Sequence, residues 1–439
     1  MVSRRRALQL AGAGFVALAG CADGGGETPN PTDADTPTET PPATSSTPTS
    51  ETPDAAGVEL TGAAATWTRS FDGTLRTDPA VVADRVAVVV DTTVYGLDAA
   101  SGETRWTFES PVTVDAEYGR PTASLHVHDG TLYALVGVSV GTGAHDYVLH
   151  ALTPGGDERW RYESPLRKFH QVAGFGDGAA VIPTHDDAIG GGREETTFAV
   201  NLHNGTRRWR ADTGDGMDGA VGRRYAAVET YGAVDCLGLA GGTHRFRYSP
   251  DGDADIGASA VGSGRLFVGL QPFAQNADGP SLVALDAASG DEQWSLRDAT
   301  VSSLRTPDDL YVGGDAVLRL SPDGTERWRY DRGGLLTGVP FDDEALYTNA
   351  GASVVAVDRG SGDELWSADT SDVALPRARG GDAVVSSDGG ARTVYAHGVS
   401  DGDERWRATL SGEYPPTPAA DADGAYLATA GGDLLKVPF

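Results

Sequence analysis

A short pattern of one glycine, three further residues and an aromatic residue recurs eight times along this chain. The aromatic residues are, in chain order, Trp106, Trp160, Trp209, Phe246, Trp294, Trp328, Trp366 and Trp406. Successive copies lie from 34 residues (Trp294 to Trp328) to 54 residues (Trp106 to Trp160) apart. A repeat of this period is typical of one supersecondary unit copied around an array, so the repeat constrains the fold more than any other feature.

One repeat unit reads as four antiparallel strands. Gly264–Leu270 is rich in β-branched and aromatic residues, Ser281–Asp286 follows as a second strand, and a tight turn at Gly290 leads into a third strand at Gln293–Leu296. A further short strand between residues 298 and 306 opens the next unit. With no helix expected after the leader, we predict an all-β fold, a single β-propeller of four-stranded antiparallel blades. A solenoid is the alternative, but it would need capping units at its ends.

The two ends of the chain predict how the ring closes. The segment around Trp67 resembles the last strand of a blade, whereas Ala425–Ala430 and Asp433–Phe439 read as middle strands with no last strand after them. We therefore predict that the N-terminal strand around Trp67 completes the C-terminal blade. Including Trp67, the repeat count gives nine blades, or eight if one unit is degenerate. The weakest units are those that end at Phe246 and Trp328.

The repeat has a fuller form, Ala-x-Asp-x-x-Ser/Thr-Gly-x-x-x-Trp. It is complete at Ala284–Trp294 and Ala356–Trp366 and nearly complete at Gly96–Trp106 and Ala199–Trp209, where Asn201 replaces the aspartate. This form resembles the repeat of the pyrroloquinoline quinone (PQQ) β-propeller family. In that family the aromatic residue docks against the backbone of the neighbouring blade. The resemblance implies this structural role for Trp67, Trp106, Trp160, Trp209, Phe246, Trp294, Trp328, Trp366 and Trp406.

The resemblance covers Trp67 to Phe439 and leaves more than one function open. Some members of the family are quinone-dependent dehydrogenases, and others are cofactor-free propellers, among them a lipoprotein of the bacterial outer-membrane assembly machinery. The dehydrogenases typically carry adjacent cysteines over the cofactor and a calcium ion held by Glu, Asn and Asp. This chain has two cysteines, Cys21 and Cys236, which are far apart in sequence. We therefore expect no bound PQQ and no catalysis, with a PQQ-dependent dehydrogenase as the alternative.

The first residues have the layout of an export signal. Arg4 and Arg5, which resemble a twin-arginine motif, precede the apolar stretch Ala7–Gly20. That stretch is too short to span a bilayer, which takes about 20 apolar residues. The small residues before Cys21 resemble a lipobox, and this implies that Cys21 is lipidated and becomes the mature N-terminus.

The domain prediction follows from these signals. Residues 1–20 form the signal peptide, and residues 21–60 form a Thr/Pro/Asp-rich tether that is too poor in apolar residues to fold. Residues 61–439 form the propeller. We expect the protein to be lipid-anchored on the extracellular face of the cytoplasmic membrane, which it contacts through the anchor only.

The charge balance is strongly acidic. The chain carries 63 Asp and Glu against 34 Lys and Arg, for a formal net charge of −29, and its only lysines are Lys168 and Lys436. Acid-rich, lysine-poor chains are typical of halophiles that accumulate salt, because high salt screens the repulsion between surface carboxylates. An acidic face for a cationic partner is the alternative. Nucleic acid is excluded as a partner, since binding it needs clustered positive charge.

Loop lengths indicate where a partner would bind. In a four-stranded meander the first and third turns share one rim, and the second turn and the connection to the next blade share the other. The long insertions 137–146, 185–194 and 271–280 all fall on the second rim. We predict that this rim binds a protein or small-molecule ligand at the cell surface. Neutral drift of loop length is the alternative, since insertions in loops are tolerated cheaply.

Three further patterns are candidate sites. Asp251, Asp253 and Asp255 alternate in the connection after Phe246 and offer oxygen ligands for calcium, although chance explains such a run in so acidic a chain. Asn204 begins an N-glycosylation sequon that is also a turn sequence. Histidines gather in the second and third units, but without a supporting cysteine or carboxylate spacing we assign them no metal. They are His126, His128, His145, His150, His170 and His185.

The sequence therefore predicts a surface-anchored, non-enzymatic binding or scaffold lipoprotein built on a PQQ-like propeller. The alternatives are the dehydrogenase and a lipoprotein that binds a solute or an envelope glycan. No catalytic residue is assigned, and the identity of the ligand is left open.

Overall fold

A computed structural model describes most of the chain after the leader and tether. The described residues are 57–114, 119–139, 145–164, 169–185, 196–214, 216, 218–250, 254–272, 279–297, 299–338, 341–388, 392–411 and 417–439. Asp54–Phe439 form one compact unit, and its described residues are strands and turns with no helix. None of the described residues, therefore, belongs to a helix that could cross a membrane.

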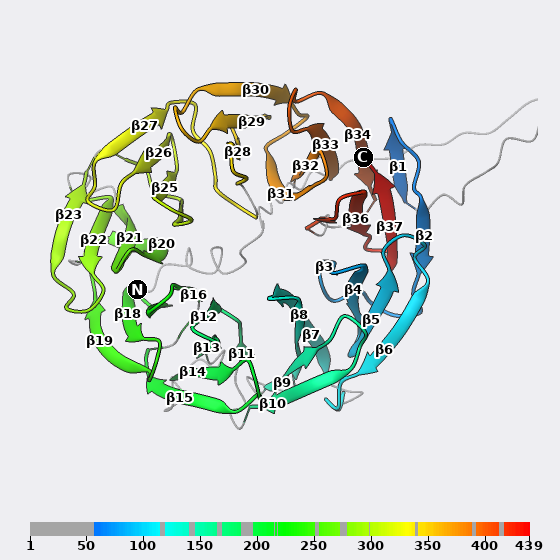
Figure 1. Ribbon diagram of the computed structural model, residues 1–439, viewed down its shortest axis with the longest axis horizontal. Helices are drawn as coiled ribbons and strands as arrows, with labels where there is room; N and C mark the ends of the chain where they lie inside the picture. Colours follow the sequence, from blue (N-terminus) through cyan, green and yellow to red (C-terminus); the bar gives the residue numbers. More distant parts are fainter. Residues whose placement is uncertain are drawn as a thin grey trace, which may run out of the picture. The chain divides into compact units, whose positions relative to one another are not determined.

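Nine antiparallel sheets surround a common axis, as Figure 1 shows, and together they form a nine-bladed propeller. Consecutive strands of each sheet run from the axis outward and are called A to D below. The first blade contains β3 (Ala80–Val82), β4 (Arg85–Val90), β5 (Thr93–Asp98) and β6 (Thr104–Glu109). The second contains β7 (Arg120–His128), β8 (Thr131–Ser139), β9 (His145–Leu152) and β10 (Glu158–Glu163). The third contains β11 (Phe169–His170), β12 (Gly174–Gly176), β13 (Ala179–His185), β14 (Thr196–Asn201) and β15 (Arg207–Asp212).

The next three blades each have four strands. The fourth blade contains β16 (Asp218–Val221), β17 (Tyr225–Thr230), β18 (Ala233–Gly238) and β19 (Thr243–Tyr248). The fifth contains β20 (Ala254–Gly262), β21 (Arg265–Pro272), β22 (Leu282–Asp286) and β23 (Glu292–Leu296). The sixth contains β24 (Ser303–Arg305), β25 (Leu310–Gly313), β26 (Val317–Leu320) and β27 (Glu326–Tyr330). The units that end at Phe246 and Trp328 are thus complete blades, and nine by repeat count is confirmed.

The last three blades depart from the simple pattern. The seventh has three strands, the eighth has a fifth strand on its outer edge, and the ninth takes its outer strand from the N-terminal part of the chain. The seventh blade contains β28 (Ala345–Asn349), β29 (Ser353–Asp358) and β30 (Glu364–Asp369). The eighth contains β31 (Ala374–Gly380), β32 (Ala383–Asp388), β33 (Thr393–Gly398), β34 (Glu404–Leu410) and β1 (Val58–Thr61). The ninth contains β35 (Ala419–Ala420), β36 (Gly424–Ala428), β37 (Asp433–Pro438) and β2 (Trp67–Ser70).

The ring closes as the sequence predicts. β2 pairs antiparallel with β37, with Trp67 opposite Lys436, so the N-terminal strand completes the ninth blade. β1, of which all but the last residue lies within the stretch predicted as tether, pairs with β34 on the outside of the eighth blade. The segment from β1 to β2 (residues 57–70, here called the strap) therefore crosses from the eighth blade to the ninth on the outer wall of the ring.

The hydrophobic core lies between blades rather than within one of them. Buried residues of the first blade, such as Val89, pack with residues of the second, such as Leu132 and Val136. The same arrangement joins the eighth and ninth blades, where Trp406 and Leu435 belong to one cluster. Each sheet is apolar on both faces because each face is covered by a neighbouring blade, which explains the nearly continuous apolar B and C strands.

One rim of the ring is held by a repeated hydrogen bond. In seven blades, the residue that follows the C strand donates its backbone amide to a carbonyl oxygen in the A–B turn of the same blade. These bonds run from Ala99 to Asp84, Leu202 to Gly178, Leu239 to Arg224, Ala287 to Gly264, Arg359 to Glu344, Val399 to Asp382 and Phe439 to Asp423. We call this the turn rim. The opposite rim, made of B–C turns and D–A connections, is called the loop rim.

Candidate functional site

The aromatic residue of each repeat lies on a D strand and points into the next blade. In seven blades the Trp indole Nε1 donates to a carbonyl of the neighbouring C–D turn. The bonds run from Trp67 to Ala99 (3.2 Å), Trp106 to Pro154 (2.9 Å), Trp160 to Leu202 (2.8 Å), Trp209 to Leu239 (2.7 Å), Trp294 to Pro322 (3.0 Å), Trp328 to Arg359 (2.9 Å) and Trp366 to Val399 (2.7 Å). These residues hold neighbouring blades together and are not free to contact a ligand.

The glycine of the repeat packs against a different blade from the aromatic residue that follows it. Gly102 has φ +70°, and a Cβ atom there would lie 2.5 Å from the ring of Trp67, which belongs to the previous blade. Gly290 receives Phe246 in the same way, with a Cβ distance of 2.7 Å. Only glycine leaves room for the ring and tolerates this backbone conformation. The glycine of each such copy therefore contacts the aromatic ring of the previous blade, whereas the aromatic residue of the same copy contacts the next blade.

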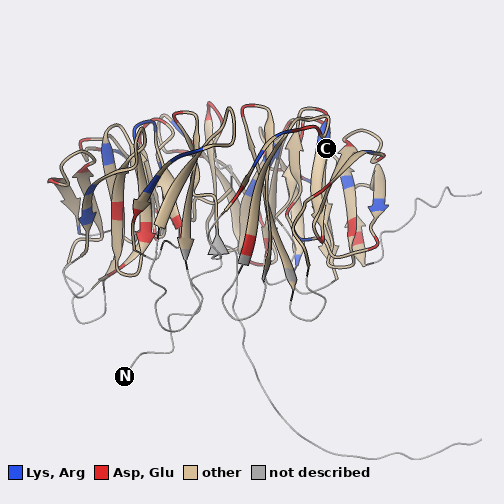
Figure 2. Ribbon diagram, turned by 90° about the horizontal axis from the view of Figure 1, so that it is seen from below, with Lys and Arg blue, Asp and Glu red and all other residues tan. Residues whose placement is uncertain are grey.

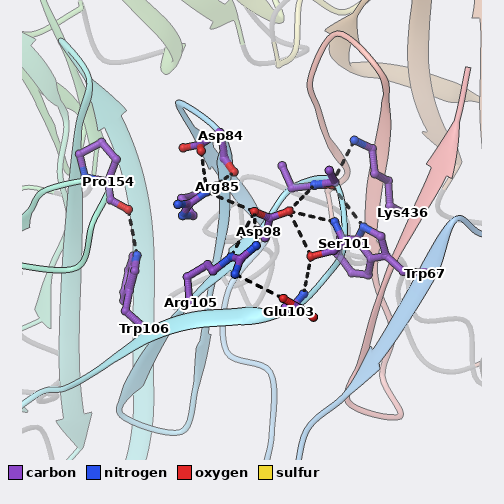
Figure 3. A network of polar contacts seen from close by, with 12 residues as sticks. Trp67, Asp84, Arg85, Asp98, Ser101, Glu103, Arg105, Trp106, Pro154 and Lys436 are labelled. Carbon is purple, nitrogen blue, oxygen red and sulfur yellow. Dashed lines mark hydrogen bonds and ion pairs between the residues drawn. The ribbon is translucent and has the colours of Figure 1, made fainter.

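The aspartate of the repeat shapes the C–D turn. Asp98 Oδ1 accepts hydrogen bonds from the amides of Ala100 and Ser101, while its Oδ2 accepts from Arg105 (Figure 3). The hydrogen bond from the Ser101 amide, followed by that from Arg105, lowers the pKa of Asp98 to about 2. Asp286 makes the same two amide contacts in the fifth blade. The Asp-x-x-Ser-Gly element is thus a turn device and carries no ligand chemistry.

A lysine joins this architecture where the ring closes. Lys436 is 4% exposed, and its Nζ lies 3.1 Å from Asp421 Oδ2 and 3.2 Å from the carbonyl oxygen of Ala99. That carbonyl also accepts from Trp67 (Figure 3). The buried ammonium is paired and hydrogen-bonded, which is the condition for burying a charge at tolerable cost. It links the ninth blade to the first.

Two aromatic positions differ from the other seven. Phe246 has no N–H and contacts the next blade through its ring alone. Trp406, which is 1% exposed, has an indole Nε1 with no hydrogen-bond partner. The strap packs against the hydrophobic cluster that contains Trp406, through Val58, Leu60, Ala63 and Ala65.

A second polar array crosses the junction of the first and second blades. Ser110 Oγ lies 2.9 Å from His150 Nε2, and His150 Nδ1 lies 2.8 Å from Glu158 Oε1. This order of serine, histidine and carboxylate is the one that activates a nucleophile. However, Ser110 is 3% exposed and His150 is 0% exposed, so a substrate has no access to either. Burial lowers the pKa of His150 despite Glu158, so the imidazole is neutral and the array acts as a clamp between blades.

The loop rim differs from blade to blade. In the second and fifth blades the B strands extend beyond the common length, to Ser139 in β8 and Pro272 in β21. Their partners His145 and Ala254 extend with them, so part of each predicted insertion is strand and not loop. The apices 140–144, 186–195 and 273–278 lie outside the described residues.

Exposed apolar side chains occur on the same rim in three separate parts of the ring. Among the described residues, five large hydrophobic side chains are exposed, and three of them lie in loop-rim segments: Val114 (40%), Tyr231 (58%) and Val373 (44%). Val127 lies near a turn, and Leu365 lies on the outer strand β30. Exposed apolar groups on loops carried by a rigid scaffold are a feature of binding surfaces.

Charged side chains line the axis. Asp218, the first residue of β16, and Arg305, the last residue of β24, are both exposed and influence each other's ionisation. They belong to the fourth and sixth blades, which lie on either side of the fifth. Partial dehydration raises the pKa of Asp218 and lowers that of Arg305. Asp78 and Arg377, from the first and eighth blades, influence each other's ionisation in the same way without an ion pair.

A cavity of about 520 Å³ opens beside Asp78. Leu75 pairs with Val90 and Ala80 with Ala87, so the chain between them carries two residues more than regular pairing needs. This bulge places residues 76–79 in the wall of the cavity. The remaining walls come from β7 of the second blade and the B–C turn of the ninth. They comprise Ala123, Ser124, Leu125, His126, Ala428, Thr429 and Ala430.

A smaller cavity of about 270 Å³ lies on the other side of β7 and shares Ser124 and His126 with the first. It extends to Tyr147 and Gln171. His126 Nε2 lies 3.1 Å from Ser124 Oγ, and burial lowers the pKa of His126 to about 4. Both cavities therefore present a neutral imidazole and a hydroxyl. No sequence motif marks these positions.

The residues predicted to bind calcium or to carry a glycan lie in different parts of the chain. Asp251 and Asp253 lie outside the described residues, and Asp255 lies in strand β20 opposite Gln271, not in the connection where the sequence placed it. The described residues contain no group of three or more His, Cys, Asp or Glu arranged to hold a metal. Asn204 is exposed at a C–D turn, and its Oδ1 accepts from Thr206.

The remaining predictions concern the leader and the other histidines. Arg4, Arg5 and Cys21 lie outside the described residues. His126 and His128 share one face of β7, as expected, and both contact the ring of Phe175. Cys236 is fully buried as a small hydrophobic side chain.

Fold and repeat together define a PQQ-like β-propeller. The model of one protein family, described as outer membrane protein assembly factor BamB, matches residues 48–180, 193–321 and 313–438. This chain belongs to that family, which confirms the resemblance seen in the repeats. A search of curated protein sequences finds no significant match.

Solved structures with a similar arrangement include BamB from Moraxella catarrhalis, with 16% identity over 86% of this chain and 100% of that one and a TM-score of 0.43. The computationally designed protein Ika8 has 14% identity over 84% and 97% and a TM-score of 0.48. Quinohemoprotein alcohol dehydrogenase from Comamonas testosteroni has 13% identity over 86% and 76% and a TM-score of 0.43. At these values the likenesses carry no argument about function.

The residues present do not fit the quinone cofactor. The resemblance implies adjacent cysteines over PQQ, and the chain has only Cys21 and Cys236. Cys236 is buried at the junction of the fourth and fifth blades, where its Sγ lies 3.4 Å from the carbonyl oxygen of Ala287, and burial raises the pKa of its thiol to about 12. Such a thiol is held away from the axis and is unreactive.

Proposed function

We propose that this protein is a lipid-anchored, non-enzymatic propeller that binds a partner protein on its loop rim at the extracellular face of the cytoplasmic membrane. The observation that carries the proposal is the contrast between the two rims. The turn rim repeats one hydrogen bond from blade to blade, whereas the loop rim carries three of the five exposed large hydrophobic side chains among the described residues.

The path of the chain supports the same assignment. β1 runs antiparallel to β34, so Val58 lies beside Leu410 at the loop-rim end of the eighth blade. The Ser411 amide donates to the Gly57 carbonyl oxygen at 2.7 Å, which fixes the point where the chain enters the ring. A tether that leads from Cys21 to Gly57 would therefore join the ring at the loop rim. A partner on that rim would sit on the membrane side of the ring.

Photocrosslinking in the native host tests the binding rim. A photoreactive phenylalanine derivative replaces Tyr231, which is 58% exposed on the loop rim, or Leu365, which is 52% exposed on the outer wall. We expect a discrete crosslinked protein from position 231 and none from position 365. Equal crosslinking from both positions, or none from position 231, would contradict the assignment.

Two further measurements test the anchor and the absence of catalysis. Cys21→Ala should release the protein into the medium and abolish incorporation of labelled lipid; retention of both label and membrane association would argue against the anchor. Purified protein in molar salt with added PQQ and Ca²⁺ should give no dye-linked oxidation of alcohols or sugars. Turnover in that assay would replace the scaffold role with the dehydrogenase.

A further inference from the structure

The cavity beside Asp78 lies at the axial side of the first blade and is separate from the exposed loop-rim side chains. Its charged lining residues are Arg76 and Asp78, which the bulge between Leu75 and Ala80 presents to the same hollow. The opposite charges lie two residues apart in sequence and form no ion pair with each other. Each group therefore keeps unused capacity for a ligand.

Asp78 is a carboxylate without a counterion in contact. Its Oδ1 accepts from the Thr417 amide at 2.8 Å, and no described residue forms an ion pair with it. Dehydration raises its pKa, and the hydrogen bonds from Thr417 and the charge of Arg377 oppose that rise only in part. A partly dehydrated carboxylate is stabilised by any cation that donates hydrogen bonds to it.

Arg76 offers the complementary charge. Its Nη2 lies 3.4 Å from Asp91 Oδ1, a long contact, and its Nε is buried without a hydrogen-bond partner. Arg377 of the eighth blade influences Asp78 through its charge but does not line the cavity, and its Nε contacts Ser387 Oγ at 3.3 Å. The Arg76 guanidinium thus shares the cavity with the Asp78 carboxylate, and a planar carboxylate ligand matches its donor geometry.

The rest of the lining is neutral. His126 is uncharged near pH 7 because burial lowers its pKa to about 4, and Ser124 and Thr429 add hydroxyl groups. Leu75 and Leu125 supply apolar surface. The charge pattern is therefore one negative group and one positive group in a neutral wall, within a volume of about 520 Å³.

We propose that this cavity binds a small zwitterion of amino-acid or dipeptide size, with its ammonium group on Asp78 and its carboxylate on Arg76. A simple anion or cation would satisfy only one of the two charges and leave the other partly dehydrated, which is unfavourable. A neutral polyol would satisfy neither.

Calorimetric titration in molar KCl tests the proposal. The probes are glycine, L-glutamate, L-lysine and diglycine, compared with acetate, methylammonium and glycerol. We expect at least one of the zwitterions to bind, and to bind at least tenfold more tightly than any of the single-charge or neutral compounds. Asp78→Asn should weaken that binding at least tenfold. Arg76→Gln should weaken binding of the same zwitterion by a similar factor.

Asp218→Asn is the matched control. Asp218 is also an exposed carboxylate at the start of an inner strand, with a pKa raised by dehydration and opposed by the charge of an arginine, but it does not line this cavity. The Asp218→Asn variant should bind the zwitterion as the unaltered chain does. Thermal unfolding of the Asp78→Asn, Arg76→Gln and Asp218→Asn variants checks that each is folded. Glycerol binding as tightly as the zwitterions, equal loss in Asp218→Asn, or no heat from any zwitterion would overturn the proposal. Crosslinking from Tyr231 is read separately, so either proposal can fail alone.

Discussion

His397 occupies a position that the propeller otherwise reserves for aliphatic side chains. It follows Ala396, which lies opposite Trp406, and the corresponding residues beside the other eight aromatic residues are Leu or Val. These residues are Leu97, Leu152, Val200, Leu237, Leu285, Leu320, Val357 and Val437. His397 is 1% exposed, and neither of its ring nitrogens has a hydrogen-bond partner.

We therefore expect His397→Leu to stabilise the protein. An unpaired buried polar group costs about 1–3 kcal/mol, and leucine restores the side chain found in the other blades. The substitution also removes a pH dependence. Burial lowers the pKa of His397 to about 4, whereas an unfolded histidine titrates near 6.5. As pH falls from 6.5 to 4 the unfolded chain takes up the proton first, so wild-type stability falls by about 3 kcal/mol from this residue alone.

The assay is urea unfolding in molar KCl at pH 7.5 and pH 4.5, with His150→Leu as the control. His150 is equally buried but bonded to Ser110 and Glu158, so its replacement strands both partners and should destabilise by about 2–4 kcal/mol. The advantage of His397→Leu should grow as pH falls. A destabilised His397→Leu at pH 7.5, or an advantage independent of pH, would refute the reasoning.

Three other substitutions and one truncation probe the blade junctions, each by thermal and urea unfolding. Trp160→Phe and Trp406→Phe both remove buried side-chain volume, but only Trp160→Phe also removes a donor, the one to Leu202, so it should cost about 1 kcal/mol more than Trp406→Phe; similar losses in the two would argue against the hydrogen bond. Gly156→Ala should destabilise by more than 1 kcal/mol, because its Cβ would lie 2.5 Å from Trp106 at φ +89°, and unchanged stability would show that the ring can move. A chain that begins at residue 62 should lose about 1–3 kcal/mol relative to one that begins at residue 57, because Val58 and Leu60 pack against the core of the eighth and ninth blades; identical unfolding curves would mean that the strap contributes nothing.

Much of the fold could be predicted because the repeat is local. The strands, the C–D turns and the last strand at Trp67 each have a signature of a few consecutive residues, and the nine-bladed count followed from adding them. The strap could not be found in this way. Val58–Thr61 is four residues with two polar side chains beside a low-complexity stretch, and only pairing with β34 makes it a strand.

The candidate sites show the same division. The contact of Gly102 with Trp67 and the array of Ser110, His150 and Glu158 join residues from different blades, so no spacing in the sequence reveals them. The cavity depends on two extra residues in one inner strand, and such a bulge has no fixed sequence. The loop-rim prediction rested on length alone; the structure adds the exposed Tyr231 and shows that part of the length is strand.

The strap also has a mechanical consequence. A load applied to the chain before Gly57 would act along β1, parallel to its axis and away from the loop rim, so the pairs from Val58–Leu410 to Thr61–Arg407 would carry it together in shear. Shear resists rupture better than peeling, in which pairs break one at a time. If the ring is held by its N-terminus, the strand that bears the pull is β1, and β2, which seals the ninth blade, is loaded only after β1 has yielded.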